Sequence, residues 1–577
     1  MNYCKSPITE VPVDGIQAFR EWDHILEVFN QKVQEHLELN AGKCVLAVET
    51  YPGVDDAELV SALESLKPAL LIHMEDGLCS KEKFKEQIHP FMTDDRVFGR
   101  MYFGTLSDFQ VAEKLENFRE KVKHTSGLIL IYGVGAAELT TPDLLVYADM
   151  ARWEIQQRYR KGMSNYHTDN PDEDNLKKFK QGYFFEWRIA DKIKRSLYDK
   201  IDFYLDTNRG GHPRMITGDA FRKGLREVVS GPFRTVPYFD PGVWGGQWMK
   251  SVCGLDPSKK NYAWSFDGVP EENSIYLKVN DVLIESPSIN VVFYCPQELL
   301  GSKVYARYGA EFPIRFDFLD TMDGQNLSLQ VHPLTDYIHN QFGMNYTQDE
   351  SYYILDARED ASVYLGVKDE TVPEEMLHDL REAQKGDIIF DADKYINHFP
   401  AKKHDHFLIP AGTIHCSGRN CMVLEISATP YIFTMKLWDW ERLGLDGKPR
   451  PIHIDHGEKV IQWNRRTEWV KENLVNAIHM VQENEDYTEE HTGLHELEPI
   501  ETRRYDIKTS CTIQTNNNVN MLNLVEGKAA VIESPDGKFA PYEVHYAETF
   551  IIPASVGTYT IRPADNEPVK VIRAYIR

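Results

Sequence analysis

The chain has 577 residues, of which 42% are hydrophobic and 27% charged, the composition of an ordinary globular protein. This length exceeds what one hydrophobic core normally serves, so about three domains are expected. The net charge of -25 argues against a nucleic-acid partner, because most of the surface would repel a phosphate backbone.

Targeting and redox features point to the cytoplasm. The sequence MNYCKSPITEVPVDGIQAF at the start contains no apolar targeting segment, and no apolar run reaches 18 residues. The eight cysteines form no CxxC pair and no dense framework, which is typical of reduced thiols. We therefore expect a cytoplasmic protein that does not insert into a membrane.

Short apolar segments alternate with longer helix-period segments through residues 1–210. The apolar segments are CVLAVE (44–49), ALLIHM (69–74), RMYFGT (100–105), LILIYG (128–133) and DFYLDT (202–207). The helix-period segments include 107–123 and 175–201. This alternation predicts an α/β sandwich domain, with a mostly parallel sheet and helices on both faces.

One turn in this domain has the outline of a phosphate-binding loop. CVLAVETYPGVDDAELVSAL reads as strand, glycine turn and helix, and the whole domain looks like a nucleoside-kinase-type fold. The Gly-Lys-Ser/Thr ending is missing, because Val54, Asp55 and Asp56 follow Gly53. Two carboxylates there would repel a triphosphate. We interpret the domain as a degenerate P-loop-like unit with a structural or partner-binding role.

From residue 238 onward the chain predicts short strands, turn-rich joints and few helices, the pattern of β jelly-roll domains. A helical insert is expected at 372–388. HFLIPAGTIHCSGR (406–419) is echoed by TFIIPASVGTYTIRP (549–563), which carries Thr558 where the first copy has His415. We therefore predict two jelly rolls, at 238–460 and 461–577.

Metal-type side chains gather in the first of these jelly rolls. In the strand LSLQVH, side chains alternate, so Gln330 and His332 share a face that is either a wet outer surface or a lined cavity. Glu350 follows 18 residues later and His415 follows the helical insert. Together they would form a site of two imidazoles, one amide and one carboxylate. Such donors suit zinc, with iron, manganese and nickel as alternatives.

Several motifs in order resemble those of type I mannose-6-phosphate isomerases, which belong to the cupin superfamily. They are VWGG (243–246), FPIRFDFLD (312–320), LSLQVHP, DESYYILDA, FLIPAGTIHCSG, LEIS, LWDW and GKPRPIHID. The resemblance covers about residues 238–577 and implies a catalytic cupin followed by a second, metal-free cupin. It also implies one Zn²⁺ per chain, bound by Gln330, His332, Glu350 and His415.

The same resemblance implies the reaction and its residues. The family interconverts mannose 6-phosphate and fructose 6-phosphate through a cis-enediol, so a hexose phosphate is the expected small-molecule partner. Ser328 matches a phosphate-contacting serine, and Trp244, in VWGG, is expected to contact substrate. Glu425 and Lys436 are the expected catalytic residues. The oligomeric state stays open.

Three departures from the family pattern weaken the expected phosphate site. Asp317 and Gln348 stand where the family carries lysines, and Lys436 stands where it carries arginine. Lysine keeps the charge but loses the planar fork that grips oxyanions. The loss would be offset only if other cations lie nearby in space, for which Arg307, Arg315, Lys402 and Lys403 are the candidates. The alternative hypothesis is a metal-bearing, sugar-binding cupin with a regulatory or altered role that has lost isomerase activity.

Overall fold

The computed structural model describes residues 2–429, 431, 433–493 and 495–577. It divides into two compact units, each made of segments that are not continuous in sequence. One unit contains Ile8–Val228 and Ser274–Tyr294, and the other contains Met1–Pro7, Val229–Asn273 and Cys295–Arg577. The division into 1–210, 238–460 and 461–577 stays a prediction, because compactness alone places both β-rich segments in one unit.

A seven-stranded sheet forms the centre of the first unit. In spatial order its strands are β2 (Ala18–Arg20), β8 (Arg214–Thr217), β7 (Phe203–Asp206), β6 (Leu144–Asp149), β3 (Lys43–Thr50), β5 (Gly127–Gly133) and β4 (Leu70–His73). The five strands from β7 to β4 are parallel, whereas β8 and β2 are antiparallel additions. A mostly parallel sheet is what the alternating sequence predicts.

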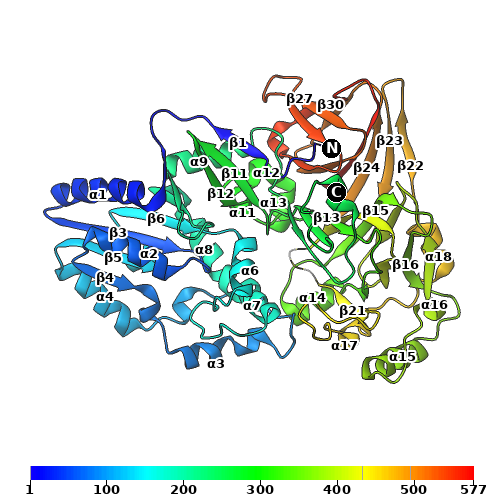
Figure 1. Cartoon of the computed structure of the whole chain (residues 1–577), viewed down its shortest axis with the longest axis horizontal. Helices are drawn as coiled ribbons and strands as arrows, with labels where there is room; N and C mark the ends of the chain where they lie inside the picture. Colours follow the sequence, from blue (N-terminus) through cyan, green and yellow to red (C-terminus); the bar gives the residue numbers. More distant parts are fainter. Residues whose placement is uncertain (1, 430, 432, 494) are drawn as a thin grey trace. The chain divides into compact units, whose positions relative to one another are not determined.

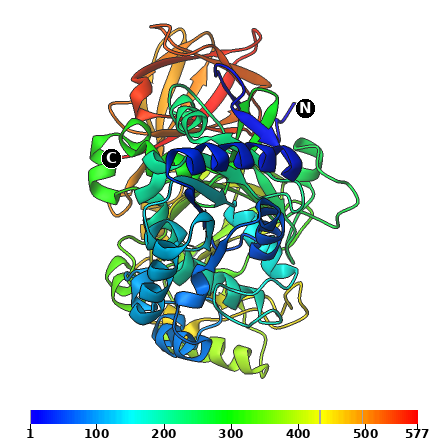
Figure 2. The same cartoon turned by 90° about the vertical axis from the view of Figure 1, so that its left-hand side faces the viewer.

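Helices cover both faces of this sheet, as Figures 1 and 2 show. On one face α1 (Glu21–Leu39) and α2 (Asp56–Leu63) pack their apolar residues against β3, β5 and β6. On the other face α4 (Ala112–His124) packs against β4 and β5. The strands are apolar on both sides because each side is buried by a helix.

The strand predicted at RMYFGT is wrong, and a strand that was not predicted, β6, lies at Leu144–Asp149. Residues 100–105 are irregular, and Tyr102 N donates to Phe184 O. The Tyr102 ring packs on the rings of Phe91, Phe109 and Phe185. The apolar character of this segment therefore serves an aromatic cluster instead of a sheet.

The second unit is built from antiparallel sheets. A six-stranded sheet contains, in spatial order, β18 (His406–Ile409), β15 (Asp349–Ala357), β20 (Cys421–Ala428), β13 (Arg315–Asp320), β10 (Trp264–Gly268) and β9 (Tyr238–Asp240). A five-stranded sheet contains β17 (Ile396–Pro400), β16 (Ser362–Val367), β19 (His415–Ser417), β14 (Leu329–Val331) and β21 (Met435–Trp438). Helix α15 (Pro373–Lys385) occupies the predicted insert.

Two further sheets follow toward the C-terminal end. One contains β22 (His479–Glu483), β23 (Tyr487–Gly493), β24 (Ile500–Ile507), β31 (Val569–Ile576), β26 (Asn520–Glu526) and β29 (Thr549–Ile552). The other contains β25 (Cys511–Gln514), β30 (Thr558–Pro563), β27 (Ala529–Glu533) and β28 (Tyr542–His545). Their apolar faces form one core, which includes Leu522, Phe550, Ile532 and Tyr559. Among the described residues, no helix is both long enough and apolar enough to span a bilayer.

Candidate metal centre and active site

Strands from two different sheets bring the predicted metal ligands together. Gln330 on β14 lies directly opposite His415 on β19, and His332 follows β14. Glu350 comes from β15, in the six-stranded sheet. All four side chains are buried, and both imidazoles are 0% exposed. The group His332, Glu350 and His415 has its potential ligand atoms within 4.8 Å of one another.

The Glu350 carboxylate lies between the two imidazoles. Its Oε1 is 2.7 Å from His415 Nε2, and its Oε2 is 3.1 Å from His332 Nε2. The side-chain amide of Gln330 is 3.2 Å from His415 Nε2. Among the described residues, His332 Nε2 has no hydrogen-bond partner in spite of its burial.

Backbone carbonyls fix the tautomer of both rings. His332 Nδ1 donates to Phe433 O at 3.0 Å, and His415 Nδ1 donates to Thr413 O at 2.9 Å. With the proton on Nδ1, each Nε2 lone pair points toward the Glu350 carboxylate, where acceptor faces acceptor. A divalent cation, or a protonated ring, removes that repulsion. Carbonyl-anchored imidazoles with converging Nε2 atoms are typical of metal sites, so these residues fit a metal ion.

Gln348, which stands where the family carries lysine, orients the carboxylate. Its Nε2 donates to Glu350 Oε2 at 3.0 Å, and its Oε1 accepts from Phe433 N at 2.9 Å. The same Phe433 backbone therefore anchors both His332 and Gln348. The amide supports the ligand set, but it brings no positive charge to a substrate.

Ser328 lies in a cluster of charges that the sequence did not predict. Its hydroxyl donates to Asp439 Oδ1 at 2.7 Å and accepts from Arg450 Nη1 at 3.1 Å. Arg450 and Arg442 both bind the Asp439 carboxylate, at 2.9 and 2.6 Å. Two guanidiniums share one carboxylate, so the cluster keeps a net positive charge beside Ser328. Arg450 belongs to the motif GKPRPIHID, which is the sequence signal that could have indicated its place in the site.

Lys436 lies in the same row of side chains as two candidate ligands. On β21 it is directly opposite Gln330, which is opposite His415 on its other side. Residues directly opposite in antiparallel strands project from the same face of the sheet. The Lys436 side chain therefore projects from the face that carries Gln330 and His415.

Glu425 belongs to a buried charged row on the facing sheet. It lies opposite Asp317 on β13 and opposite Tyr352 on β15. Burial, then the neighbouring carboxylates of Glu350 and Asp317, raise the pKa of Glu425 well above its ordinary value. Burial also raises the pKa of Asp317 to about 7, although the charge of Arg315 opposes the shift.

Arg315 is a buried guanidinium opposite Ser427 on β20, next to this row. It is 1% exposed and lies two residues before Asp317, on the same face of β13, with Nη2 at 3.7 Å from Asp317 Oδ2. Among the described residues, Nε, Nη1 and Nη2 have no hydrogen-bond partner. Arg315 is one of the four cations proposed to replace the family's missing positive charges. It is the one that lies on the six-stranded sheet with unsatisfied donors.

The other predicted residues lie elsewhere. Lys403 pairs with Glu526, and Arg307 lines a separate cavity. Trp244 is 2% exposed and packs edge to face on Trp264, 5.0 Å between ring centroids. Its carbonyl accepts from Gln325 N at 3.0 Å, which holds the segment leading to Ser328.

The P-loop-like turn of the first unit is filled by its own side chains. The Asp55 carboxylate caps α2 by accepting from Ala57 N and Glu58 N at 3.0 and 3.2 Å. Asp56 pairs with His73 at 3.1 Å, and Arg158 Nη1 donates to Gly53 O at 3.0 Å. The amides that would bind a phosphate already bind a carboxylate.

We expect the full-length protein to bind ATP no more tightly than about 1 mM, because Asp55 competes for the α2 amides and repels the triphosphate. Isothermal titration calorimetry with Mg-ATP measures this directly. Saturable binding in the micromolar range, weakened by Arg158→Met, would contradict the interpretation.

Comparisons with known proteins fall on two parts of the chain. Residues 21–230 match a family described as a domain of unknown function (DUF8485). The mannose-6-phosphate isomerase ManA of Bacillus subtilis is 22% identical over 335 residues, which are 58% of this chain and 96% of that protein. The Streptococcus mutans mannose-6-phosphate isomerase is 27% identical over 221 residues, 38% of this chain and 64% of that protein.

A solved structure is also similar. The crystal structure of the Bacillus subtilis mannose 6-phosphate isomerase gives a TM-score of 0.49 at 17% identity, covering 60% of this chain and all of that one. The sequence similarity to mannose-6-phosphate isomerases supports the conclusion that this protein is an isomerase.

Proposed function

We propose that the protein is a zinc-dependent aldose-ketose isomerase that interconverts mannose 6-phosphate and fructose 6-phosphate through a cis-enediol. The observation that carries this proposal is the convergence of His332, Glu350 and His415, with Gln330 beside them, in a chain similar to mannose-6-phosphate isomerases. In the aldose-to-ketose direction the reaction moves one proton from C2 to C1 and a second proton from O2 to O1, with both transfers reversed in the opposite direction.

In this proposal Gln330, His332, Glu350 and His415 hold the ion. When bound, a divalent cation would polarise and order the two adjacent substrate oxygens on which charge develops. Zinc suits two imidazoles and a carboxylate, and other divalent metals compatible with this donor set are the alternatives. Gln348 keeps the Glu350 carboxylate oriented through the bond described above.

Glu425 is the proposed proton carrier. The transfer requires a group that reaches C1 and C2 from one side of the enediol. Glu425 lies opposite Tyr352 on β15, and Tyr352 packs against His415 at 5.7 Å between ring centroids. As carboxylate it would accept the C2 proton, and as carboxylic acid it would return that proton to C1.

Lys436 and Arg315 are the proposed cations for the enediolate. Lys436 shares the ligand face of the five-stranded sheet, and Arg315 presents unsatisfied donors on the facing sheet. Donors aimed at a developing oxyanion lower the barrier most when the site excludes water. These two cations would replace the positive charges of the lysines that the family carries at the positions of Asp317 and Gln348.

Ser328 and Arg450 are the proposed phosphate contacts. The serine hydroxyl and the Arg450 guanidinium are 3.1 Å apart, and Arg442 adds a second guanidinium through Asp439. Arginine suits this role because its fork matches phosphate oxygens. Trp244 supports the segment before Ser328 through its carbonyl, so its proposed contact with substrate is indirect.

The second candidate function is a metal-bearing, sugar-binding cupin with a regulatory or altered role. Asp317 favours it, because a buried carboxylate replaces a family lysine beside Glu425. This candidate predicts metal and ligand binding without turnover.

A coupled assay with mannose 6-phosphate, in which fructose 6-phosphate is detected as product, separates the two functions. We expect turnover that a chelator removes and that added Zn²⁺ restores, because the proposed isomerisation depends on the bound cation. Protein with a full complement of metal and no turnover would leave the regulatory function standing.

A further inference from the structure

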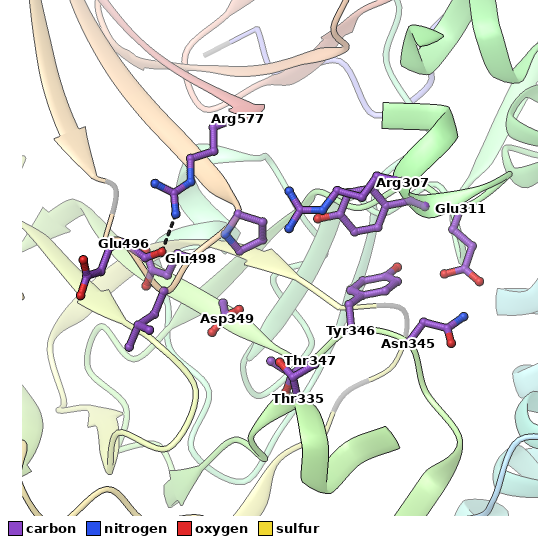
Figure 3. A pocket seen from close by; sticks show the side chains of 13 residues that line it. Arg307, Glu311, Thr335, Asn345, Tyr346, Thr347, Asp349, Glu496, Glu498 and Arg577 are labelled. Atoms are coloured by element: carbon purple, nitrogen blue, oxygen red, sulfur yellow. Dashed lines mark hydrogen bonds between the residues drawn. The ribbon is translucent and has the colours of Figure 1, made fainter. Parts of the chain in front are cut away.

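A cavity separate from the candidate metal ligands lies in the second unit. Its volume is about 280 Å³, and it is bounded by α13 (Ser302–Tyr308), the start of α14 (Thr335–Phe342), residues 345–349 and the loop 496–499 (Figure 3). Successive residues of a strand point to opposite faces, so Asp349 faces this cavity while Glu350 faces the metal centre. The two sites therefore use opposite faces of β15.

The cavity lining is mostly charged and holds more carboxylates than guanidiniums. The carboxylates belong to Glu311, Asp349, Glu496 and Glu498, and the guanidiniums to Arg307 and Arg577. Arg577 also donates to Glu496 O. In Figure 3 the Arg307 guanidinium lies on the opposite side of the cavity from Asp349, Thr335 and Thr347. One side can therefore bind an anionic group while the other side offers acceptors.

Glu498 is the group that indicates a ligand. It is 6% exposed, and among the described residues its Oε1 has no hydrogen-bond partner, while the carboxylate interacts with the backbone amides of His495, at 3.4 Å from Oε2, and Ile409. Burial and the charge of Asp349 raise the pKa of Glu498 well above its ordinary value. A buried carboxylate oxygen without a donor costs stability, and a ligand that donates to Glu498 Oε1 would remove that cost.

A buried cation that interacts with these carboxylates, Arg465, is hydrogen-bonded to other groups. The charges of Asp349 and Glu498 act on the Arg465 guanidinium. Its Nη1, however, donates to Pro410 O at 2.6 Å and Ala411 O at 2.7 Å, and also to the Thr413 hydroxyl. Asp349 Oδ1 accepts from Ala411 N at 2.9 Å, which leaves its other oxygen toward the cavity. The floor of the cavity therefore offers two carboxylate oxygens to a positively charged group.

We propose that this cavity binds a small molecule that carries a primary ammonium group and an anionic group. The ammonium group lies between Glu498 and Asp349, and the anionic group binds Arg307. The cavity volume of about 280 Å³ suits a ligand the size of one sugar or one amino acid. An amino-sugar phosphate and a free amino acid share this chemistry. The site is independent of the proposed isomerisation.

Calorimetry on the full-length protein tests the proposal with three probes: D-glucosamine 6-phosphate, L-serine, and D-glucose 6-phosphate, which has a hydroxyl in place of the ammonium group. We expect one of the first two probes to bind saturably, and the probe that binds identifies the source. Glu498→Gln and Arg307→Met should each weaken that binding about 10- to 100-fold, since each removes a charge-assisted bond.

The control is Glu485→Gln, which removes an exposed carboxylate outside the cavity lining and should change the affinity less than about 3-fold. Without a probe, Glu498→Gln should leave the melting temperature unchanged or raise it, because it removes an unsatisfied buried carboxylate. The proposal is overturned if neither ammonium probe binds, or if Glu498→Gln and Arg307→Met leave binding unchanged. It is equally overturned if glucose 6-phosphate binds with the same sensitivity to Glu498→Gln.

Discussion

Replacing His415 with alanine is expected to remove the metal from the protein. The variant loses the shortest of the contacts to Glu350, the 2.7 Å approach of Nε2 to Oε1, and a ligand anchored by its bond to Thr413 O. Changes to groups that only support metal ligands cost about 10- to 100-fold in affinity, so losing a ligand should cost more. Elemental analysis should find about one zinc-class ion per wild-type chain and little in the variant.

His378→Ala provides a matched control, because it removes an exposed imidazole on α15, outside the candidate site. Its metal content should equal that of the wild type. Circular dichroism and the melting temperature show whether the His415 variant still folds. A folded His415→Ala protein with a stoichiometric metal would refute the ligand assignment. A second ion bound near Thr558 in the wild-type protein would refute the prediction that residues 461–577 form a metal-free jelly roll.

Replacing Lys436 with methionine is expected to lower kcat by on the order of 10²-fold or more, the effect typical of deleting one donor to a developing oxyanion. Methionine keeps the length of the side chain and removes its charge. KM should change much less, because the lost interaction forms mainly in the transition state. Steady-state kinetics with mannose 6-phosphate separates the two parameters.

Two further variants sharpen this test. Lys402→Met removes an exposed lysine and should leave kcat within about 2-fold, since exposed charges contribute little. Arg450→Met should act chiefly on KM, because the phosphate is bound in the ground state and the transition state alike. If Lys436→Met leaves kcat unchanged while Arg450→Met raises KM, Lys436 does not stabilise the enediolate.

Much of the architecture could be predicted because the local patterns were strong. Leu327, Leu329 and Val331 are buried, as the alternation in LSLQVH requires. The charged periodicity of 107–123 gave α4, and the insert at 372–388 gave α15. These elements depend mainly on which face of a short segment is apolar, which the sequence shows directly.

Features that depend on distant residues could not be predicted in the same way. The segment 100–105 looked like a strand because its aromatic content serves contacts with Phe91 and Phe185, the second of which is about 80 residues away along the chain. Arg450 reaches Ser328 across 122 residues, and Glu498 reaches the cavity beside Asp349 from the loop before β24. Nothing in the local pattern around Asp317 indicates that Arg315 keeps unsatisfied donors. Such features come from tertiary packing.

The most direct test of the account is isotope exchange on the metal-replete protein. Mannose 6-phosphate deuterated at C2 is incubated with the enzyme, and NMR follows the label at C2 of the aldose and C1 of the ketose. The account predicts loss of label from C2 to solvent or its transfer to C1, with chelator abolishing both. Complete retention of the label at C2 by metal-replete protein, with no ketose formed, would contradict the proposed isomerisation.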